Sequence, residues 1–478
     1  MLLRQIFDPH LAQYAYLVGC QRTGEALLID PERDIDRYRE MAAENDLRIT
    51  AVAETHIHAD FVSGGREFAQ DSNVDLYLSA EGGPDWTYQW PAGRPLTHFL
   101  KHGDHFMVGN IRVEAVHTPG HTPEHLSYLI TDLGGGADQP IALATGDFVF
   151  VGDVGRPDLL ESAAAIKGTM EPSAQKLQES LRDRLAPFAD YLQLLPAHGA
   201  GSACGKALGA VPTSTLGYER RFNNSLKLAI NDGDAFVREI LSGQPEPPLY
   251  FATMKRVNRD GIAVTGGVPK PPRLKAAEFS RIVADKDVQI LDTREDRKAF
   301  DAAHVVRAIH APLRSAFFST TAGSYLAEND SIVLVLEKDE DADLAVRQLY
   351  RIGFDHIVGW ITAGEAKAGG LFAEREERID FPDFQPARAL EQGEIIDVRT
   401  SAEFQRGHLE GARSFPYTRL KTRLGELPKN RRLFIHCGTG RRASLAASFL
   451  RSEGFDAVHI DGVCAECEQI ASAEGIAH

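Results

Sequence analysis

The first half of the chain alternates short apolar runs with polar stretches, a pattern typical of a mixed α/β protein. Two β-type runs between Tyr14 and Asp30 flank the polar stretch Cys20 to Gly24, which predicts a hairpin. The apolar, β-branched run Ile49 to Glu54 predicts a buried strand. Helices are expected over Ile35 to Asn45, 161–170 and 173–189.

The second half repeats one pattern of strands and helices. The strand-like run Val288 to Asp292 is answered by Ile395 to Asp397. Farther along, Ser331 to Leu336 is answered by Arg432 to Cys437. Strands that alternate with helical patterns form parallel βαβ units, so each copy should be an α/β domain of about 90 to 100 residues.

Length and Pro/Gly-rich stretches set the expected domain boundaries. A chain of 478 residues is too long for a single core. Pro and Gly gather at Gln244 to Pro248 and at Gly266 to Pro272, where we expect connecting segments. The expected organisation is a first domain at 1–250, a linker at 251–273, and repeat domains at 274–375 and 376–478.

Side chains that bind metals stand at the ends of the apolar runs. The donors placed in this way are His56, His58, Asp60, His121, Asp147 and His198. Imidazole and carboxylate groups gathered at strand ends suit a transition metal. For the loop from Thr55 to Gly65 alone, a polar loop that happens to hold two histidines is the alternative.

The second repeat carries a cysteine on a glycine-rich loop. The loop residues are Cys437, Gly438, Thr439, Gly440, Arg441 and Arg442. Glycines let successive backbone N–H groups turn inward, and a helix beginning near Arg442 points its positive end at the sulfur. This arrangement favours a reactive thiolate or persulfide at Cys437. The first repeat has Leu336 at the matching position, so we expect it to be a catalytically silent scaffold.

The order of the metal-binding motifs over residues 1–250 resembles the metallo-β-lactamase superfamily, which implies an αββα sandwich. Phe61 stands where hydrolases such as glyoxalase II carry a histidine of a second metal site, so the resemblance is closest to the persulfide dioxygenases. These implied ligands form the two-histidine, one-carboxylate face of non-haem iron enzymes. The resemblance implies one Fe(II) per chain on His56, His121 and Asp147, with His58, Asp60 and His198 orienting ligands and bound water around it.

The same resemblance implies the substrates, a low-molecular-weight thiol persulfide and O2, with sulfite as product. One alternative is a zinc thioester hydrolase of the glyoxalase II type. Another is a non-enzymatic sulfur-relay or sensor protein whose metal is structural.

Both repeats resemble rhodanese domains, which implies two three-layer α/β folds. The second repeat has the Asp397-Val-Arg399 strand end, the turn Gly407 to Ala412 and the cysteine loop. The resemblance implies that Cys437, assisted by Arg442, moves sulfane sulfur between a persulfide, sulfite and thiosulfate. In the loop, Gly438, Thr439, Gly440 and Arg441 are the substrate-binding candidates.

Several other positions are candidates for a role at the active sites. Arg156 could bind a carboxylate of the thiol carrier or brace Asp158, and Cys204 could accept sulfur, line the entrance or be a small loop residue. Tyr218 could cover an anionic substrate. The pair Cys464 and Cys467, on what reads as the last helix, lacks the second pair of a tetrahedral zinc site, so a metal or redox role there is the less favoured interpretation.

Composition excludes some classes of binding partner and favours one cellular compartment. A net charge of −16 without a Lys/Arg cluster argues against nucleic acid and anionic membranes. Five cysteines without a secretory signal favour the cytoplasm, where we expect the thiols to stay free. We also expect a homo-oligomer, a dimer or a tetramer.

Overall fold

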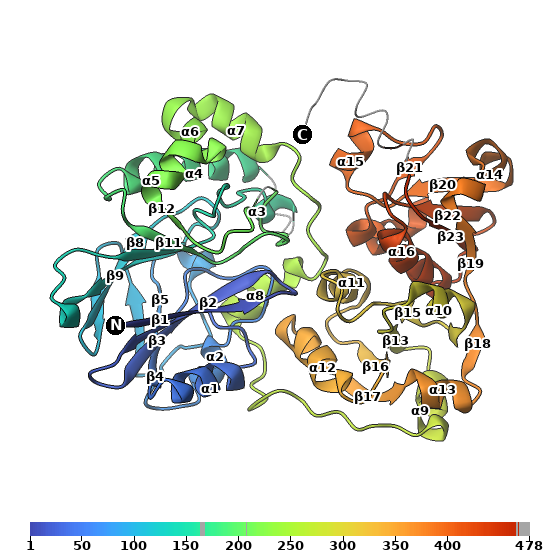
Figure 1. Cartoon of the computed structure of the whole chain (residues 1–478), viewed down its shortest axis with the longest axis horizontal. Coiled ribbons are helices and arrows are strands. Elements are labelled where there is room, and N and C mark those ends of the chain that lie inside the picture. The colour runs from blue at the N-terminus through green and yellow to red at the C-terminus, as the bar shows by residue number, and fades with distance from the viewer. Residues whose placement is uncertain (163–167, 207, 465–466, 468–478) are drawn as a thin grey trace. The chain divides into compact units, whose positions relative to one another are not determined.

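The computed structural model describes residues 1–162, 168–206, 208–464 and 467, and these form two compact units (Figure 1). The first unit comprises Met1–Pro247, Phe251–Val268 and Arg351–Gly353. The second comprises Pro248–Tyr250, Pro269–Tyr350 and the described residues from Phe354 onward. The donor-rich half of the sequence and the repeated half therefore fold as separate bodies.

The first unit contains two six-stranded sheets. One has the order β1-β2-β3-β4-β5-β6, with strands Leu2–Asp8, Gln13–Cys20, Glu25–Ile29, Arg48–Ala53, Asp75–Ser79 and Thr97–Leu100. The other has the order β12-β11-β10-β9-β8-β7, with strands Ser214–Thr215, Gln193–Pro196, Ala142–Gly146, Leu126–Asp132, Ile111–His117 and His105–Val108. The expected hairpin is β2 and β3, which pair antiparallel.

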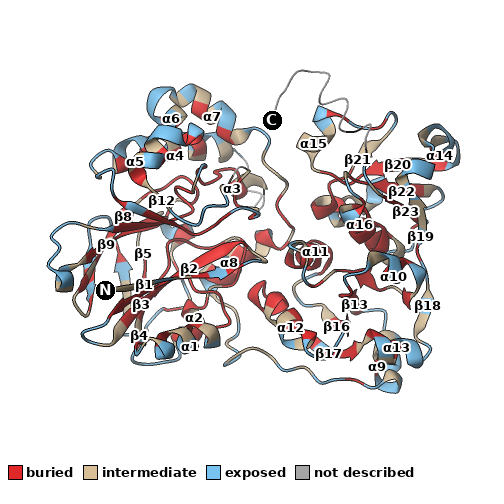
Figure 2. Ribbon diagram, in the orientation of Figure 1, coloured by how far each residue is buried: buried red, intermediate tan, exposed pale blue. Residues whose placement is uncertain are grey.

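Helices cover the outer faces of both sheets (Figure 2). Apolar side chains of both sheets, such as Val18 and Val113, meet in one core. Tyr38 of α1 packs on the outer face of the first sheet, and Leu177 of α4 packs on that of the second. The helices of this unit are α1 (Asp36–Glu44), α2 (Gly65–Phe68), α3 (Leu159–Ser162), α4 (Met170–Leu185), α5 (Leu216–Phe222), α6 (Asn224–Asn231), α7 (Gly233–Leu241) and α8 (Phe251–Asp260). The αββα sandwich is confirmed.

Two helix predictions differ in their bounds. The helix expected at 173–189 is α4, which begins earlier, at Met170, and ends at Leu185. Of the helix expected at 161–170, the first two residues lie in α3, and residues 163–167 lie outside the described part of the chain.

The second unit contains two parallel sheets, one for each repeat. The first has the order β15-β13-β16-β17, with strands Ile309–His310, Val288–Asp292, Ser331–Leu336 and Ile357–Thr362. The second has the order β19-β23-β22-β20-β21, with strands Glu377–Asp380, Ala457–Asp461, Arg432–His436, Gly393–Asp397 and Arg413–Ser414. A short antiparallel pair joins β14 (His304–Val305) to β18 (Phe372–Glu374). The flanking helices are α9 (Ala276–Val283), α10 (Arg297–Ala302), α11 (Phe318–Tyr325), α12 (Asp341–Arg351), α13 (Ala363–Ala368), α14 (Pro386–Gln392), α15 (Ser401–Arg406) and α16 (Arg441–Ser452).

The two repeats pack against each other through α16. Tyr325 of α11 stacks on Phe449 of α16, with ring centroids 4.2 Å apart. The backbone N–H of His310 donates to the Ser448 hydroxyl at 2.9 Å. The first repeat therefore supports the helix that follows the cysteine loop.

The stretch expected to be a linker contains α8, and residues 251–268 fold with the first unit. The side-chain amide of Asn258 donates to the backbone carbonyls of His58 and Phe61, each at 2.8 Å. Its oxygen accepts from the backbone N–H of Ser63 at 2.9 Å. Pro and Gly residues indicate where the chain can turn, but they do not reveal that one buried amide joins α8 to the first unit. The predicted end of the first domain, at residue 250, therefore falls before α8.

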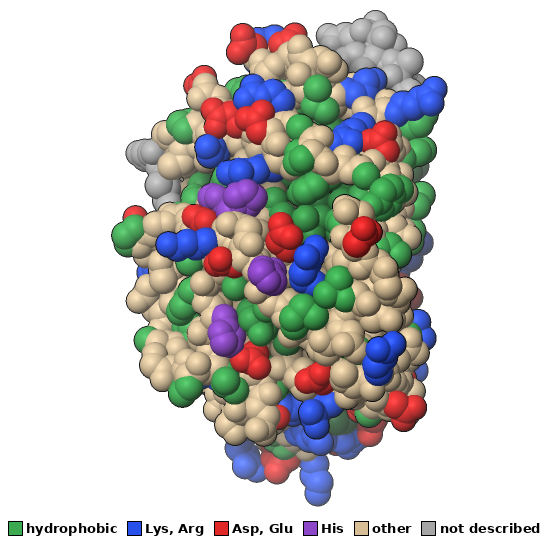
Figure 3. Space-filling view, turned by 90° about the vertical axis from the view of Figure 1, so that its left-hand side faces the viewer, with side chains coloured by type: hydrophobic (Ala, Val, Ile, Leu, Met, Phe, Trp, Pro, Cys, Tyr) green, Lys and Arg blue, Asp and Glu red, His purple; other side chains and the backbone are tan. Residues whose placement is uncertain are grey.

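Charges are mixed on the face drawn in Figure 3, where acidic and basic side chains are interspersed with apolar ones. Among the described residues, the helices are too short or too polar to cross a bilayer.

The contacts of Asn258 predict a local effect on stability. Asn258→Ala leaves two buried carbonyls and one partly buried N–H without a partner, so we expect it to lower the free energy of unfolding by about 1–3 kcal/mol. Thermal unfolding of the full chain measures this loss. Asn231→Ala, at an exposed amide that bonds only within its own helix, is the control and should change stability by less than about 0.5 kcal/mol. Equal losses in the two variants would contradict the role given to Asn258.

Candidate metal centre and sulfur-transfer loop

His56, His121 and Asp147 come together at one buried point. Their donor atoms lie within 4.8 Å of one another. His121 Nε2 is 3.5 Å from Asp147 Oδ2. His56 lies in the loop that follows β4, and Asp147 directly follows β10. The sequence prediction that strand ends carry these three donors to one place agrees with the structure.

Two glycines make this approach possible. Gly146 has a φ of 52°, and a Cβ there would lie 2.6 Å from both Thr55 Oγ1 and His125 Nε2. A Cβ on Gly155 would lie 1.8 Å from the backbone oxygen of Asp147. Side chains at these positions would displace the segment that carries the carboxylate.

Hydrogen bonds fix the tautomers of the two histidines. His56 Nδ1 donates to Thr55 Oγ1 at 3.0 Å, because the Thr55 hydroxyl itself donates to Asp30. His121 Nδ1 donates to the backbone carbonyl of Arg156 at 2.9 Å. Burial lowers the pKa of His121 to about 4, and burial holds the pKa of His56 well below its ordinary value. Both rings are therefore neutral near pH 7 and present Nε2 as a free lone pair.

Asp147 gives the sharpest sign that a cation belongs here. Among the described residues, no N–H or O–H group donates a hydrogen bond to either of its carboxylate oxygens, although the side chain is fully buried. The thiol of Cys204 is a weak donor beside it. Burial raises the pKa of Asp147 to about 6, and nearby Asp60 adds to the rise. A buried carboxylate without partners is costly. Two neutral imidazoles and this carboxylate fit a divalent transition metal, which would remove the cost.

A second group of donors borders the first. Asp60, His198 and Cys204 also place their donor atoms within 4.8 Å of one another. His198 Nε2 lies 3.3 Å from Asp60 Oδ2 and 3.4 Å from Asp147 Oδ1. Burial raises the pKa of the Cys204 thiol well above its ordinary value. Cys204 is thus a protonated thiol within this donor group. This position favours a role at the centre over that of a small loop residue without chemistry.

His58 is turned toward a pair of carboxylates. Its Nε2 lies 3.2 Å from both Asp30 Oδ1 and Glu54 Oε2. Burial lowers the pKa of His58, but the two carboxylates outweigh burial and raise it well above the ordinary value. The ring stacks on Phe61, with centroids 4.3 Å apart, and contacts the tilted ring of His56, with centroids 4.2 Å apart. His58 therefore acts as a charged group that supports the ring of His56.

Two substrate-binding candidates do not have the surroundings that the prediction requires. Arg156 is buried and forms a bidentate pair with Asp158, at 2.8 and 2.7 Å. Its remaining N–H groups bond the backbone carbonyls of Ala203 and Pro245, so the bracing interpretation holds. Tyr218 on α5 is 55% exposed and packs on Phe222. Helix α5 turns this face outward because its buried residues are on the opposite side.

A cavity lies beside the loop that carries His121. It has a volume of about 470 Å³ and is lined in part by Pro119 and Gly120. Lys176 and Lys255 also line it, and the Lys255 ammonium lies 3.8 Å from the centre of the Trp86 ring. The cavity offers positive charge next to the metal-binding loop.

The cysteine loop of the second unit follows β22 and leads into α16. Gly440 has a φ of 80°, and a Cβ there would lie 2.2 Å from Asp461 Oδ1. Cys437 is buried, and α16 begins at Arg441, which agrees with the predicted helix start near Arg442. The N-terminal end of a twelve-residue helix stabilises an anion at this point.

Arg442 is held in place by Glu403. Its guanidinium forms two hydrogen bonds to that carboxylate, at 2.6 and 2.7 Å. Burial raises the pKa of Glu403, but Arg442 outweighs it and lowers that pKa to about 2. Arg442 therefore contributes fixed positive charge near the loop.

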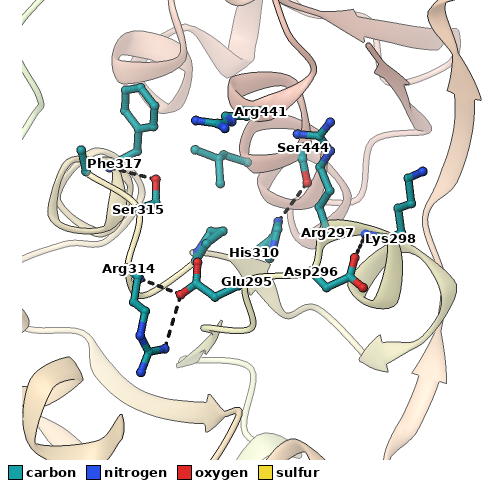
Figure 4. A pocket seen from close by; sticks show the side chains of 13 residues that line it. Glu295, Asp296, Arg297, Lys298, His310, Arg314, Ser315, Phe317, Arg441 and Ser444 are labelled. Atoms are coloured by element: carbon teal, nitrogen blue, oxygen red, sulfur yellow. Dashed lines mark hydrogen bonds and ion pairs between the residues drawn. The ribbon is translucent and has the colours of Figure 1, made fainter.

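A cavity of about 550 Å³ lies between the first repeat and α16 (Figure 4). Arg297, Lys298 and Arg314 of the first repeat line it together with Arg441 of the cysteine loop. Leu336 itself is fully buried in β16. Glu295 and Asp296 line it as well, so the first repeat lacks the thiol but forms one wall of a cavity of mixed charge at the cysteine loop.

The expectation that all thiols stay free is wrong for one pair. Cys464 and Cys467 form a disulfide, with Cα atoms 5.3 Å apart. This separation lies in the range that a disulfide needs, which the spacing in sequence alone did not guarantee. Cys20, Cys204 and Cys437 are free.

Sequence reasoning missed several residues that hold the centre together. Asp30, Glu54, Thr55 and Asn258 form hydrogen bonds with the loop that carries His56 and His58. Asp30 and Glu54 carried a signal, because each ends an apolar run as the metal donors do.

Comparisons with known proteins agree with this architecture. The family model "Metallo-beta-lactamase superfamily" matches residues 9–193, and "Rhodanese-like domain" matches residues 275–365 and 385–463. A crystal structure of a metallo-β-lactamase from Staphylococcus aureus subsp. aureus COL is 39% identical, with a TM-score of 0.66, over 76% of this chain and 99% of that one.

Curated relatives match the first unit. Mitochondrial persulfide dioxygenase ETHE1 of Bos taurus is 26% identical over 48% of this chain and 78% of the relative. The probable polyketide biosynthesis zinc-dependent hydrolase BaeB of Bacillus velezensis is 24% identical over 44% of this chain and 82% of the relative. The chain belongs to the metallo-β-lactamase superfamily, with an N-terminal region homologous to ETHE1 persulfide dioxygenase that is fused to rhodanese-like domains.

Proposed function

We propose that the first unit oxidises a low-molecular-weight thiol persulfide to sulfite with O2, using one Fe(II) per chain. The observation that carries this proposal is the cluster of His56, His121 and Asp147, next to a Phe61 that cannot bind a second metal. Iron bound there would supply open coordination positions for sulfur and O2. The general role in sulfur metabolism follows from the homology to ETHE1 and from the rhodanese-like domains.

The protein's own residues do the positioning. Thr55 and the Arg156 carbonyl hold the two imidazole rings, so that both lone pairs face the same point. His198 Nε2 lies 3.4 Å from Asp147 Oδ1 and can hold or transfer a proton there. The burial of all these groups excludes bulk water from the reacting sulfur.

Cys437 then transfers sulfane sulfur. The lone pair on the sulfur of sulfite attacks the outer sulfur of a Cys437 persulfide, and the bond between the two persulfide sulfurs breaks. Thiosulfate leaves, and the electron pair of the broken bond stays on Cys437 as a thiolate. The inward-facing N–H groups of the loop and the N-terminus of α16 stabilise that thiolate.

A zinc thioester hydrolase is the second candidate function, and one observation favours it. Asp60, His198 and Cys204 form a further donor group beside the first, which is the arrangement that a second metal would need. The relative named as a zinc-dependent hydrolase points the same way. Phe61 weighs against it, because hydrolases of this kind use an imidazole at that place.

Metal content separates these two functions. Protein purified with iron available should contain about one iron per chain, because Phe61 stands where a second site would need an imidazole. His121→Ala should lose most of it, since the ring supplies one of three ligands. His105→Ala, an exposed histidine on β7, should keep it. Elemental analysis measures all three proteins, and two zinc ions per chain would contradict the dioxygenase.

The product ratio tests the fusion. With excess persulfide and O2, the intact protein should release mainly thiosulfate, because tethering can raise the effective concentration of the second site toward the millimolar range. Cys437→Ser should release mainly sulfite while O2 uptake stays within a few-fold of the intact protein. Cys20→Ser, at a buried cysteine far along the chain from the loop, is the control. Equal ratios after correction for the uncatalysed reaction would contradict the coupling.

The cavity beside His121 predicts where the carrier thiol binds. Its two lysines would attract the carboxylates of an anionic carrier, so Lys176→Ala with Lys255→Ala should raise KM for glutathione persulfide about three- to tenfold. The value of kcat should change much less, because neither side chain belongs to the donor groups. Lys227→Ala, exposed on α6, is the matched control. A KM in the double variant equal to that of the control would place the carrier elsewhere.

A further inference from the structure

The disulfide of the second unit lies directly behind the cysteine loop. The backbone N–H of Cys464 donates to the carbonyl of Gly438 at 3.1 Å, and Gly438 is the residue after Cys437. Both sulfur-bearing side chains are buried, Cys464 completely and Cys467 to all but 4%. Any change at this pair is therefore transmitted to the backbone that surrounds the reactive sulfur.

A buried histidine faces the same pair. A ring nitrogen of His436 and the sulfurs of Cys464 and Cys467 all lie within 4.8 Å of one another. His436 is fully buried, and among the described residues its ring nitrogens have no hydrogen-bond partner beyond a backbone contact with Cys437. Its nearest carboxylate, Asp397, is 3.7 Å away and forms hydrogen bonds with Arg399. The ring thus presents unsatisfied polar atoms to the two sulfurs.

We propose that Cys464 and Cys467 form a thiol–disulfide redox site. Low-molecular-weight disulfides oxidise this pair and thiols reduce it, and its state affects His436 and the Gly438 carbonyl. In oxidation, one cysteine thiolate attacks the small disulfide and releases one thiol, leaving a mixed disulfide on the protein. The second cysteine then attacks the protein sulfur of that mixed disulfide and releases the second thiol. Two protein thiols are oxidised, and one small disulfide is reduced to two thiols.

His436 sets the balance between the two states. A disulfide has no proton to give, so the ring nitrogen that can accept a hydrogen bond stays unsatisfied in the oxidised form. A thiol S–H can donate to one of them in the reduced form. Burial lowers the pKa of His436 to about 4, against the opposing effect of Asp397, so the ring is neutral and able to accept. The histidine therefore favours the reduced form, so that small thiols can still reduce the disulfide.

A metal site is the competing use of these three donors. A structural zinc site takes four protein ligands, and the described residues supply three. The two sulfurs are bonded to each other, which removes them as thiolate ligands. These two observations favour the redox site.

The state of the pair should change the reactivity of Cys437. The disulfide holds Cys464 where its N–H binds the Gly438 carbonyl, and this fixes one peptide of the anion-binding loop. Reduction frees that segment, so the loop is less well ordered around the sulfur. This consequence rests on the sulfur-transfer role proposed above, whereas the redox chemistry of the pair does not.

The redox site is tested by counting thiols. The full-length Cys437→Ser protein, equilibrated with mixtures of reduced and oxidised glutathione, is denatured, alkylated and weighed by mass spectrometry. Two alkyl groups should be lost together as the buffer becomes oxidising, and peptide mapping should assign them to Cys464 and Cys467. In the same mixtures, His436→Leu should shift the equilibrium about tenfold toward the disulfide. A pair that stays alkylated at every ratio, or bound zinc that Cys464→Ser with Cys467→Ser removes, would overturn the proposal.

The coupling is tested by activity. Thiosulfate sulfurtransferase activity of the native sequence should fall about two- to tenfold when the pair is reduced and the protein is freed of small thiols. Cys464→Ser with Cys467→Ser should have the low rate at every ratio, and Cys20→Ser should respond as the native sequence does. Near-native far-ultraviolet circular dichroism of the double variant shows that it folds, and Cys464→Ala alone is the fallback variant. An unchanged rate would overturn the coupling, whereas no activity in any state, with the thiol count as expected, would count against the sulfur-transfer role alone.

Discussion

The first unit depends on a single electrostatic requirement, which is that the buried carboxylate of Asp147 must meet a positive charge. The surrounding imidazoles of His56 and His121 are neutral and offer lone pairs, and in the part of the chain that the structure describes no N–H or O–H group donates to either carboxylate oxygen. A bound cation would resolve this frustration and draw the loops at the ends of several strands to one point. Metal binding should therefore be coupled to the order of these loops.

The fold supplies this point through backbone contacts more than through side-chain chemistry. Gly146 and Gly155 let the Asp147 segment approach neighbouring elements closely, and Asn258 fastens the loop after β4 from a helix that lies about 200 positions later in sequence. The second unit also positions its reactive group through backbone contacts. Its reactive sulfur lies on a loop whose shape comes from Gly440, from α16 and from the hydrogen bond between the Gly438 carbonyl and the backbone N–H of Cys464.

Local periodicity and residue types at strand ends predicted both parallel repeats and the approach of His56, His121 and Asp147 to one point, whereas the sandwich followed from the resemblance of the donor motifs to the metallo-β-lactamase superfamily. Thr55, Asp30 and Asn258 escaped because their roles arise only from contacts between distant segments. Tyr218 failed as a candidate because its position near basic residues says nothing about which face of a short helix is buried. The disulfide escaped as well, since the spacing of two cysteines does not fix the separation of their Cα atoms.

Oxygen consumption tests the central claim most directly. A preparation of the full chain with bound iron, supplied with glutathione persulfide in an oxygen electrode, should consume one O2 for each persulfide oxidised, with sulfite and thiosulfate as the sulfur products. The same preparation should hydrolyse a glutathione thioester no faster than a protein whose metal has been removed. Metal-dependent thioester hydrolysis without oxygen uptake would contradict the account and establish the hydrolase instead.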